Sequence, residues 1–275
     1  MKKFLLLPIF LFIFTLSIPA QSEKALITYN RALDLQNEGK LDEALVEYGK
    51  AIALYPKMVD AFNNRANIKF GRGDLEGAIA DYTRAVELDP KSGATFFNRG
   101  TVYLQAEKFT EAVNDFSKAL ETLPKHAMAY NNRGNARADL GDYKNALADY
   151  DRAIELSPQI FEAFYNRGIL KQNLKDYAGS IADLTVAIEL QPENANVYSS
   201  RALSYETKDK AAAIADYTRV IELDPTAAQA YARRGLLLLD LKKKAEARRD
   251  LEKAIALDAS LNSGYGEFLK LAKTP

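Results

Sequence analysis

A proline recurs along this chain at a nearly constant spacing, and this period constrains the fold more than any other feature of the sequence. The prolines lie at positions 56, 90, 124, 158, 192 and 225, so the intervals are 34, 34, 34, 34 and 33 residues. A sustained period of this length indicates a solenoid of stacked structural repeats. The period divides most of the chain into seven repeats, which span residues 25–58, 59–92, 93–126, 127–160, 161–194, 195–227 and 228–261.

Small and large side chains occupy fixed positions when each repeat is numbered from its own first residue and a gap is counted for the residue that the sixth repeat lacks. Position 8 is Ala or Gly throughout, position 20 is Ala or Ser, and position 24 is aromatic or Leu. Apolar positions three, four and seven residues apart follow the period of an α-helix, and small residues let two helix axes approach to about 8–10 Å. Gly39, Gly73 and Gly141 mark a turn between two helices of about 14 residues each. The pattern therefore predicts an all-α fold with two helices in each repeat.

This arrangement resembles the tetratricopeptide repeat. The resemblance covers residues 25–261, and within the fourth repeat the family's spacing is matched by Tyr130, Gly134, Gly141, Ala146, Tyr150, Ala153 and Pro158. It implies paired antiparallel helices that stack into an α-α superhelix, with the first helix of each pair lining a concave groove. The chain departs from the family pattern at position 7, which is Arg where the family usually has Leu. The sixth repeat also lacks one residue near Glu206–Asp209 and should turn more tightly.

The two ends of the repeat array are expected to differ. Residues 262–275 should form a capping helix and a short tail, because Tyr265, Phe268, Leu269 and Ala272 fall on one helical face. This face would cover the apolar side of the last repeat. No comparable cap is expected before the first repeat, which only a short segment, residues 21–24, separates from the N-terminal segment.

Residues 1–20 have the order of a secretory signal peptide. A basic start, Met1-Lys2-Lys3, precedes an apolar run from Phe4 to Ile18 and then a small residue, Ala20. The apolar run is shorter than the roughly 20 residues that a membrane span requires. We therefore expect cleavage after Ala20 and export, to the periplasm or outside a bacterial cell. An uncleaved segment, which would be the only membrane contact, is the alternative.

Composition argues against several classes of function. The 37 Lys and Arg residues balance 37 Asp and Glu residues, so the chain has no net charge to attract nucleic acid. It has no Cys and a single His, His126, which falls in a turn between repeats. These residues cannot build the usual zinc sites, and a histidine in a turn between repeats is poorly placed for a Ser–His catalytic pair. We therefore expect no cofactor, no metal and no enzymatic activity.

Arginines and carboxylates form a ladder along the repeats. Position 7 is always Arg, at Arg31, Arg65, Arg99, Arg133, Arg167, Arg201 and Arg234. Position 23 is always acidic, at Glu47, Asp81, Asp115, Asp149, Asp183, Asp216 and Asp250. An arginine can hold a carboxylate with two parallel hydrogen bonds while its stem covers apolar surface. We expect these pairs to be structural and to join two helices of a repeat or two neighbouring repeats; a functional anion track is the alternative.

A row of side-chain amides gives the main functional hypothesis. Position 6 is Asn in the first five repeats, at Asn30, Asn64, Asn98, Asn132 and Asn166, with further amides at Asn63, Asn67, Asn131 and Asn135. One amide can pair with both the N–H and the C=O of a peptide bond. The row resembles the asparagine ladder in the repeat domain of O-linked N-acetylglucosamine transferase, which implies peptide contacts from position 6. We therefore expect these amides, with Phe97 and Tyr165, to contact a peptide; the alternative is that each Asn bonds a neighbouring repeat.

The sequence is interpreted as that of a monomeric protein–protein interaction module. Relatives that bind chaperone tails through a carboxylate clamp need Lys at positions 2 and 5, and no repeat of this chain has one there. We expect an adaptor or scaffold of the cell envelope that binds an extended or helical segment of a partner protein in its groove. The alternative is a structural scaffold component that self-associates, or docks in an envelope assembly, through its repeat ends.

Overall fold

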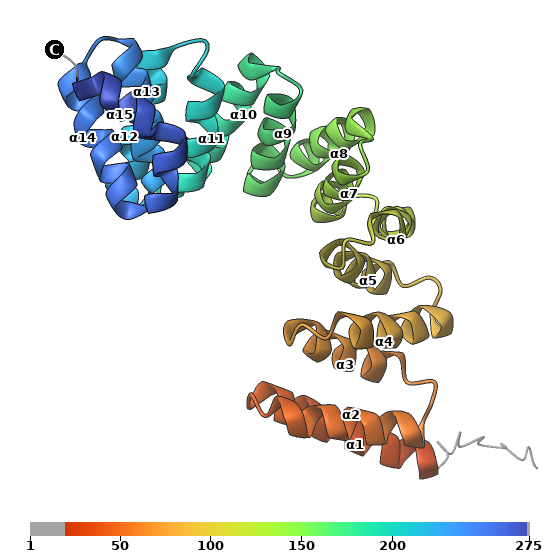
Figure 1. The fold of residues 1–275 in the computed structure, drawn as a ribbon. Coiled ribbons are helices and arrows are strands. Elements are labelled where there is room, and N and C mark those ends of the chain that lie inside the picture. Colours follow the sequence, from red (N-terminus) through yellow and green to blue (C-terminus); the bar gives the residue numbers. More distant parts are fainter. Residues whose placement is uncertain (1–19, 274–275) are drawn as a thin grey trace, which may run out of the picture. The chain divides into compact units, whose positions relative to one another are not determined.

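The computed structural model describes residues 20–273 and consists of helices joined by short turns (Figure 1). No strand occurs within these residues, so the predicted all-α fold class is confirmed. None of the helices in the same range has the length and apolar character needed to cross a membrane. The elements are α1 (Ala20–Asn37), α2 (Leu41–Leu54), α3 (Val59–Gly71), α4 (Leu75–Leu88), α5 (Gly93–Gln105), α6 (Phe109–Thr122), α7 (Ala127–Asp139), α8 (Tyr143–Leu156), α9 (Phe161–Asn173), α10 (Tyr177–Leu190), α11 (Ala195–Tyr205), α12 (Lys210–Leu223), α13 (Ala228–Asp240), α14 (Lys244–Leu257), the short 3₁₀ helix η1 (Ala259–Leu261) and α15 (Asn262–Lys273).

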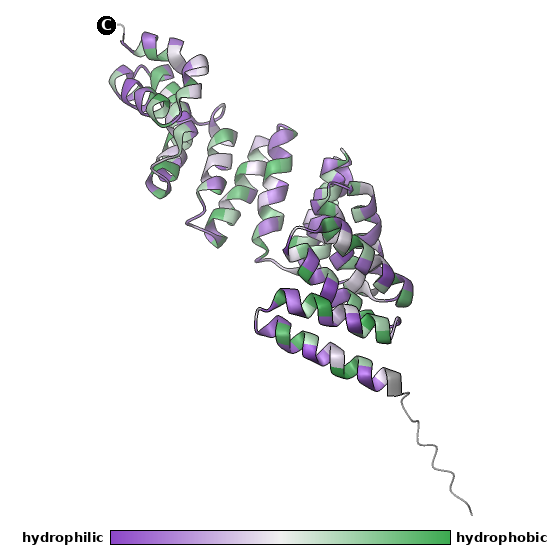
Figure 2. Ribbon diagram, turned by 60° about the horizontal axis from the view of Figure 1, so that its bottom comes forward, coloured by the Kyte–Doolittle hydropathy of each residue, from purple (hydrophilic) through white to green (hydrophobic). Residues whose placement is uncertain are grey.

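The chain forms two compact units, one through Val102 and the other from Tyr103, and the boundary falls inside α5. In the first unit α1 packs on α2 and α3 packs on α4. In the second unit the packed pairs are α7 with α8, α9 with α10, α11 with α12, and α13 with α14. Apolar and polar residues are interspersed along the helices (Figure 2). In α6 the buried residues Ala112, Phe116 and Ala119 are three or four positions apart, so they lie on one face of the helix.

The N-terminal predictions fall at the edge of the described residues. The predicted signal peptide lies outside them except for Ala20, where α1 begins. The short segment predicted for residues 21–24 belongs to α1 and continues without a break into the first repeat.

Small residues at position 8 bring the two helices of a repeat close together. In the fourth repeat Tyr150, on α8, is only 2% exposed. A Cβ atom on Gly134, in α7, would lie 2.7 Å from Cε1 of the Tyr150 ring. The close packing of α7 on α8 therefore depends on the missing side chain at Gly134.

The turn inside six of the seven repeats uses a left-handed residue at position 15. Glycine holds this position in three repeats, with φ angles of 75° at Gly39, 80° at Gly73 and 79° at Gly141. Three other repeats place a larger residue there with the same sign of φ, at Glu107, Lys175 and Lys242. The sixth repeat, which lacks a residue, closes differently. Helix α11 has 11 residues, and the Asp209 carboxylate accepts hydrogen bonds from the first N–H groups of α12.

Helix α15 covers the end of the seventh repeat. It packs on α14, and its Tyr265 contacts a buried cluster that includes Ala232, Ala254 and Leu261. Phe268 was predicted to lie on the covering face, but it is 39% exposed. Within α15 only Ala272 is buried, and Lys273 forms an ion pair of 3.3 Å with Glu252 on α14.

The first repeat leaves an apolar position open. Position 3 is buried wherever a described repeat precedes it, at Ala61, Thr95, Ala129, Ala163, Val197 and Ala230. In the first repeat the same position is Ile27, which is 64% exposed. No helix pair precedes α1 within residues 20–273. The alternative hypothesis, in which the protein self-associates through its repeat ends, would use the surface around Ile27.

Five of the position-7 arginines each hold the position-23 aspartate of their own repeat with two hydrogen bonds. Their Nε and Nη2 atoms lie 2.6–2.9 Å from the two carboxylate oxygens. The aspartates are between 3% and 7% exposed, so each is a buried charge with a matched partner. The pairs are Arg65–Asp81, Arg133–Asp149, Arg167–Asp183, Arg201–Asp216 and Arg234–Asp250.

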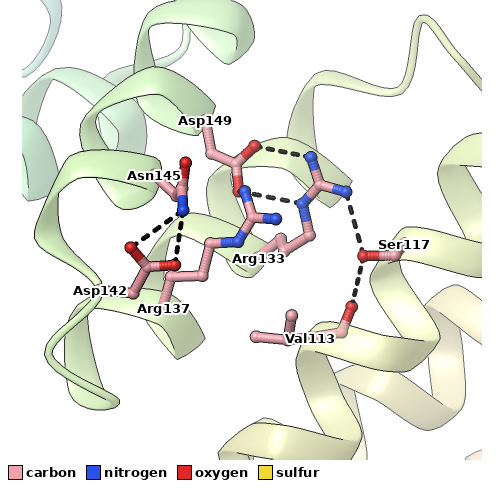
Figure 3. Close-up of polar contacts among 7 residues, drawn as sticks. All are labelled: Val113, Ser117, Arg133, Arg137, Asp142, Asn145 and Asp149. Carbon is pink, nitrogen blue, oxygen red and sulfur yellow. Dashed lines mark hydrogen bonds and ion pairs between the residues drawn. The ribbon is translucent and has the colours of Figure 1, made fainter.

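Within the described residues, four of these five guanidinium groups, all except that of Arg65, also bond to the preceding repeat. The third nitrogen of Arg133, Nη1, donates a hydrogen bond of 3.1 Å to the Ser117 hydroxyl on α6 (Figure 3). The Arg133 guanidinium also lies 5.4 Å from the centre of the Tyr130 ring on its own helix. We call this arrangement the arginine staple. Equivalent contacts with position 25 of the preceding repeat join Arg99 to Thr83, Arg167 to Asp151, Arg201 to Thr185 and Arg234 to Thr218.

Arg31 departs from the predicted ladder. It is exposed and makes no ion pair with Glu47 within the described residues, and Glu47 instead accepts a hydrogen bond of 2.8 Å from Lys50. In the first repeat position 4 is Thr28 rather than an aromatic residue. Arg31 therefore has neither the ring nor the preceding repeat that fix the other arginines. The remaining predicted members, Arg99 and Asp115, lie in different units.

Replacing Arg201 with Leu should lower the free energy of unfolding by about 3–5 kcal/mol, because Asp216 would stay buried without a cation. Arg133→Leu should cost less, since Nη1 of Arg137 lies 2.6 Å from Asp149 Oδ2 and still neutralises that carboxylate. Urea denaturation followed by circular dichroism measures both changes.

The control for this experiment removes both charges. The double variant Arg201→Leu/Asp216→Leu should recover most of the lost stability, because no buried charge is left unpaired. If Arg201→Leu were as stable as the unmodified protein, the staple would have no role in holding the repeats together.

Candidate functional site

The second unit contains an open hollow with a volume of about 740 Å³. The end of α5 and the start of α6 form one side, and α7, α8 and α9 form the rest. The lining residues are Leu104, Gln105, Glu107, Phe109, Asn135, Ala138, Asp139, Tyr143, Tyr150, Tyr165, Asn166, Ile169, Leu170 and Asn173.

The repeat itself builds the hollow. Gln105, Asp139 and Asn173 occupy position 13 of three successive repeats, at the C-terminal ends of α5, α7 and α9. Asn135 and Ile169 likewise share position 9 in two successive repeats. Equivalent positions of stacked helices therefore face one surface, and their side chains determine what that surface can bind. Position 13 was not among the predicted site positions, although its polar residues in these three repeats are visible in the sequence.

Apolar side chains form part of the lining. Leu104, Ile169 and Leu170 offer aliphatic surface from α5 and α9. Tyr165 adds an aromatic ring that stacks on Phe161 of its own helix, with ring centres 5.7 Å apart and planes 11° apart. The stacking limits the motion of the Tyr165 ring, so the hollow presents a fixed aromatic surface to a ligand.

A tyrosine orients one of the amides in the hollow. The Tyr150 hydroxyl donates a hydrogen bond of 2.8 Å to Oδ1 of Asn135. Burial, followed by the nearby carboxylates of Asp139 and Asp149, raises the pKa of Tyr150, so this hydroxyl remains a donor near neutral pH. The contact fixes the Asn135 amide with its NH₂ group available to a ligand, since no bond from that group occurs within the described residues.

Two carboxylates lie in the lining, at Asp139 and Glu107. Partial desolvation, together with the negative charge of Glu107, raises the pKa of the Asp139 carboxyl. No Lys or Arg is among the lining residues. The hollow is therefore locally negative, although the whole chain has no net charge.

The predicted asparagine row separates into two groups. Asn135, Asn166 and Tyr165 line the hollow. The other members do not line it: Asn131 is buried, Asn30 and Asn67 are exposed, and Asn63, Asn64, Asn98, Asn132 and Phe97 are half-buried. Sequence reasoning thus found part of the hollow and missed Glu107, Asp139 and Asn173.

Several of these amides bond to a neighbouring repeat. Asn64 donates a hydrogen bond of 2.9 Å to the Tyr29 hydroxyl, and Asn63 donates one of 3.2 Å to Thr95. Asn67 accepts a hydrogen bond from the Tyr82 hydroxyl within its own repeat. The contacts of Asn63 and Asn64 correspond to the alternative interpretation of the row, in which the amides join repeats.

A short chain of amides runs beside the hollow. Asn166 donates to Oδ1 of Asn131 over 3.1 Å, and Asn131 donates to Oδ1 of Asn132 over 3.0 Å. Asn131 is 2% exposed, so it is a structural link and not a ligand contact. It holds Asn166, which lines the hollow, at a fixed place on α9.

Comparison with known proteins identifies the family. Models of the tetratricopeptide repeat match residues 59–92, 97–159, 161–194, 198–226 and 228–261. The chain belongs to the tetratricopeptide repeat family, as the sequence resemblance predicted. Repeats of this family act as protein-interaction adaptors or scaffolds. No curated protein matches the chain.

Several solved structures are similar to the chain. A tetratricopeptide repeat protein from Parabacteroides merdae is 25% identical, with a TM-score of 0.66, and the match covers 93% of this chain and 100% of that one. YrrB, described as a TPR protein with an unusual peptide-binding site, is 25% identical with a TM-score of 0.56, over 71% of this chain and 97% of its own. PilF of Pseudomonas aeruginosa is 20% identical with a TM-score of 0.63, over 76% and 92%, and shows a likeness of fold alone.

Substitution of two amides should separate structural from ligand-facing asparagines. Asn131→Ala should lower the free energy of unfolding by about 1–3 kcal/mol, because the buried amide links Asn132 to Asn166. Asn173→Ala, at an exposed residue of the hollow, should change it by no more than about 0.5 kcal/mol. Thermal and urea denaturation of both variants would show the difference, and equal losses would contradict this division.

Proposed function

We propose that this protein binds a segment of a partner protein in the hollow of the second unit and acts as a non-enzymatic adaptor. The observation that carries the proposal is the lining of the hollow, in which equivalent positions of successive repeats supply apolar side chains and amides side by side. Leu104 and Ile169 can receive an apolar side chain of the segment. Asn135 and Asn166 can meet the N–H and C=O groups of its backbone.

Contacts inside the second unit support a hollow that is already formed before a ligand binds. The staples of Arg133 and Arg167 fix α7 to α8 and α9 to α10, the helices that carry much of the lining. Asn131 and Tyr150 fix the two amides described above. A partner segment would therefore meet a surface that is already ordered, which reduces the entropy cost of binding on the side of the receptor.

The similarity to YrrB supports a peptide as the ligand. That protein, 25% identical over 71% of this chain, has a peptide-binding site according to its description. The non-enzymatic part of the proposal is supported by the family, whose repeats act as protein-interaction adaptors or scaffolds.

Site-specific photo-cross-linking in the source organism tests the proposed function. A photoreactive phenylalanine derivative at Asn173 should cross-link the protein to a partner chain, because this residue is exposed in the hollow. The same group at Ala148, which is exposed on α8 outside the hollow, is the matched control and should give no such product.

A third position distinguishes the alternative scaffold function. The photoreactive group at Ile27 would report a second copy, or an assembly component, that docks on the exposed first repeat. Products at Ile27 together with none at Asn173 would contradict binding in the hollow and favour the scaffold.

We also propose that the protein is exported. The support is the order of residues 1–20, in which a basic start, an apolar run and a small residue follow one another. Mass spectrometry of the protein isolated from its source should find a mature chain that begins at Gln21 in the cell-envelope or extracellular fraction. A chain that retains Met1 and remains in the cytosolic fraction would contradict export.

A further inference from the structure

The charge of the hollow differs from that of the rest of the protein. Elsewhere in the second unit the buried aspartates Asp149, Asp183, Asp216 and Asp250 are paired with arginine staples. The two carboxylates of the hollow, Glu107 and Asp139, form no ion pair within residues 20–273. Since no lysine or arginine lines the hollow, its lining has two negative charges and no positive one.

These two carboxylates act on each other. Partial desolvation and the charge of Glu107 raise the pKa of Asp139, which means that the negative form of Asp139 is disfavoured in the free protein. A cation placed near both groups would remove this cost and would gain attraction from each of them. Apolar surface from Leu104 and Ile169 belongs to the same hollow, so a ligand can combine a positive charge with an apolar contact.

We propose that the hollow selects partner segments in which a lysine or arginine stands beside an apolar residue. The cationic group binds the carboxylates of Glu107 and Asp139, and the apolar residue packs against Leu104 and Ile169. This inference rests on the proposed function, and it specifies the chemistry of the partner that the hollow accepts. The amides of Asn135 and Asn166 are independent of sequence in their contacts, so the charged and apolar groups provide the selectivity.

The same charges disfavour other occupants. A nucleic acid or an acidic peptide would bring further negative charge to the two carboxylates, neither of which has a cation to offset it. The hollow is thus opposite in sign to the carboxylate clamps that bind chaperone tails, which need lysines. A basic peptide is the occupant that charge complementarity favours.

The test begins with a selection of peptides that does not presuppose their sequence. A library of random 12-residue peptides is selected on the immobilised full-length protein, and binding of single peptides is measured by fluorescence anisotropy. Peptides that bind in the hollow are recognised by their loss of affinity for Ile169→Gln, a neutral change to its lining. Circular dichroism checks that each variant has kept the fold.

Two charge variants then test the selectivity. Glu107→Gln/Asp139→Asn neutralises the hollow, and Glu162→Gln/Glu189→Gln neutralises two exposed carboxylates that do not line it, on α9 and α10. Peptides that depend on Ile169 should be enriched in lysine or arginine beside an apolar residue. They should bind the first variant about five- to thirtyfold more weakly and the second with unchanged affinity.

The outcomes separate this inference from the proposed function. Peptides that depend on Ile169 but contain no excess of basic residues, and bind the hollow-neutralised variant as tightly as the unmodified protein, would overturn the charge selectivity alone. If no selected peptide depended on Ile169, both the peptide-binding function and its selectivity would be wrong. Equal weakening by the two charge variants would also overturn the inference, because it would indicate attraction to the net charge of the protein.

Discussion

The arginine staple is the interaction on which the array of repeats depends. One guanidinium holds a buried aspartate of its own repeat, as Arg133 holds Asp149, and donates a further bond to the preceding repeat. Removal of either partner strands a charge in the interior, so the sequence is constrained at both positions. The staple also explains why position 7 can be Arg where related repeats usually have Leu: the stem still covers apolar surface, and the charged end adds a defined geometry.

The hollow results from the regular stacking of the repeats and from the different residues that single repeats place at equivalent positions. Identical stacking brings position 13 of successive repeats to one surface, and the residues there differ: Gln105, Asp139 and Asn173. Glu107 adds a second carboxylate from the left-handed turn position that glycine occupies in three other repeats. A uniform scaffold thus presents a surface whose charge and apolar area belong to one place in the array, which is what a selective adaptor requires.

The repeat period predicted the fold, because small residues and prolines at constant spacing leave few other ways to bury the apolar faces. The period could not predict which polar residues are buried and which line the hollow. Asn131, at position 5, is buried between repeats, whereas Asn166, at position 6, lines the hollow, and the two amides bond to each other. Arg31 has the same position as Arg133 and no staple: its repeat has Thr28 in place of the aromatic ring, and Glu47 bonds to Lys50 instead. Glu107 lies in the turn after α5 and Asp139 at the end of α7. Whether these two carboxylates come near each other depends on how the repeats stack.

Hydrogen–deuterium exchange of the free protein tests most directly whether the staples form the hollow before a ligand arrives. If they do, the backbone amides of α7 and α9 are as strongly protected as those of α13 without any ligand, and a bound peptide adds protection only at the lining residues. Free exchange throughout α7 and α9, with protection that appears only when peptide is added, would contradict a preformed site.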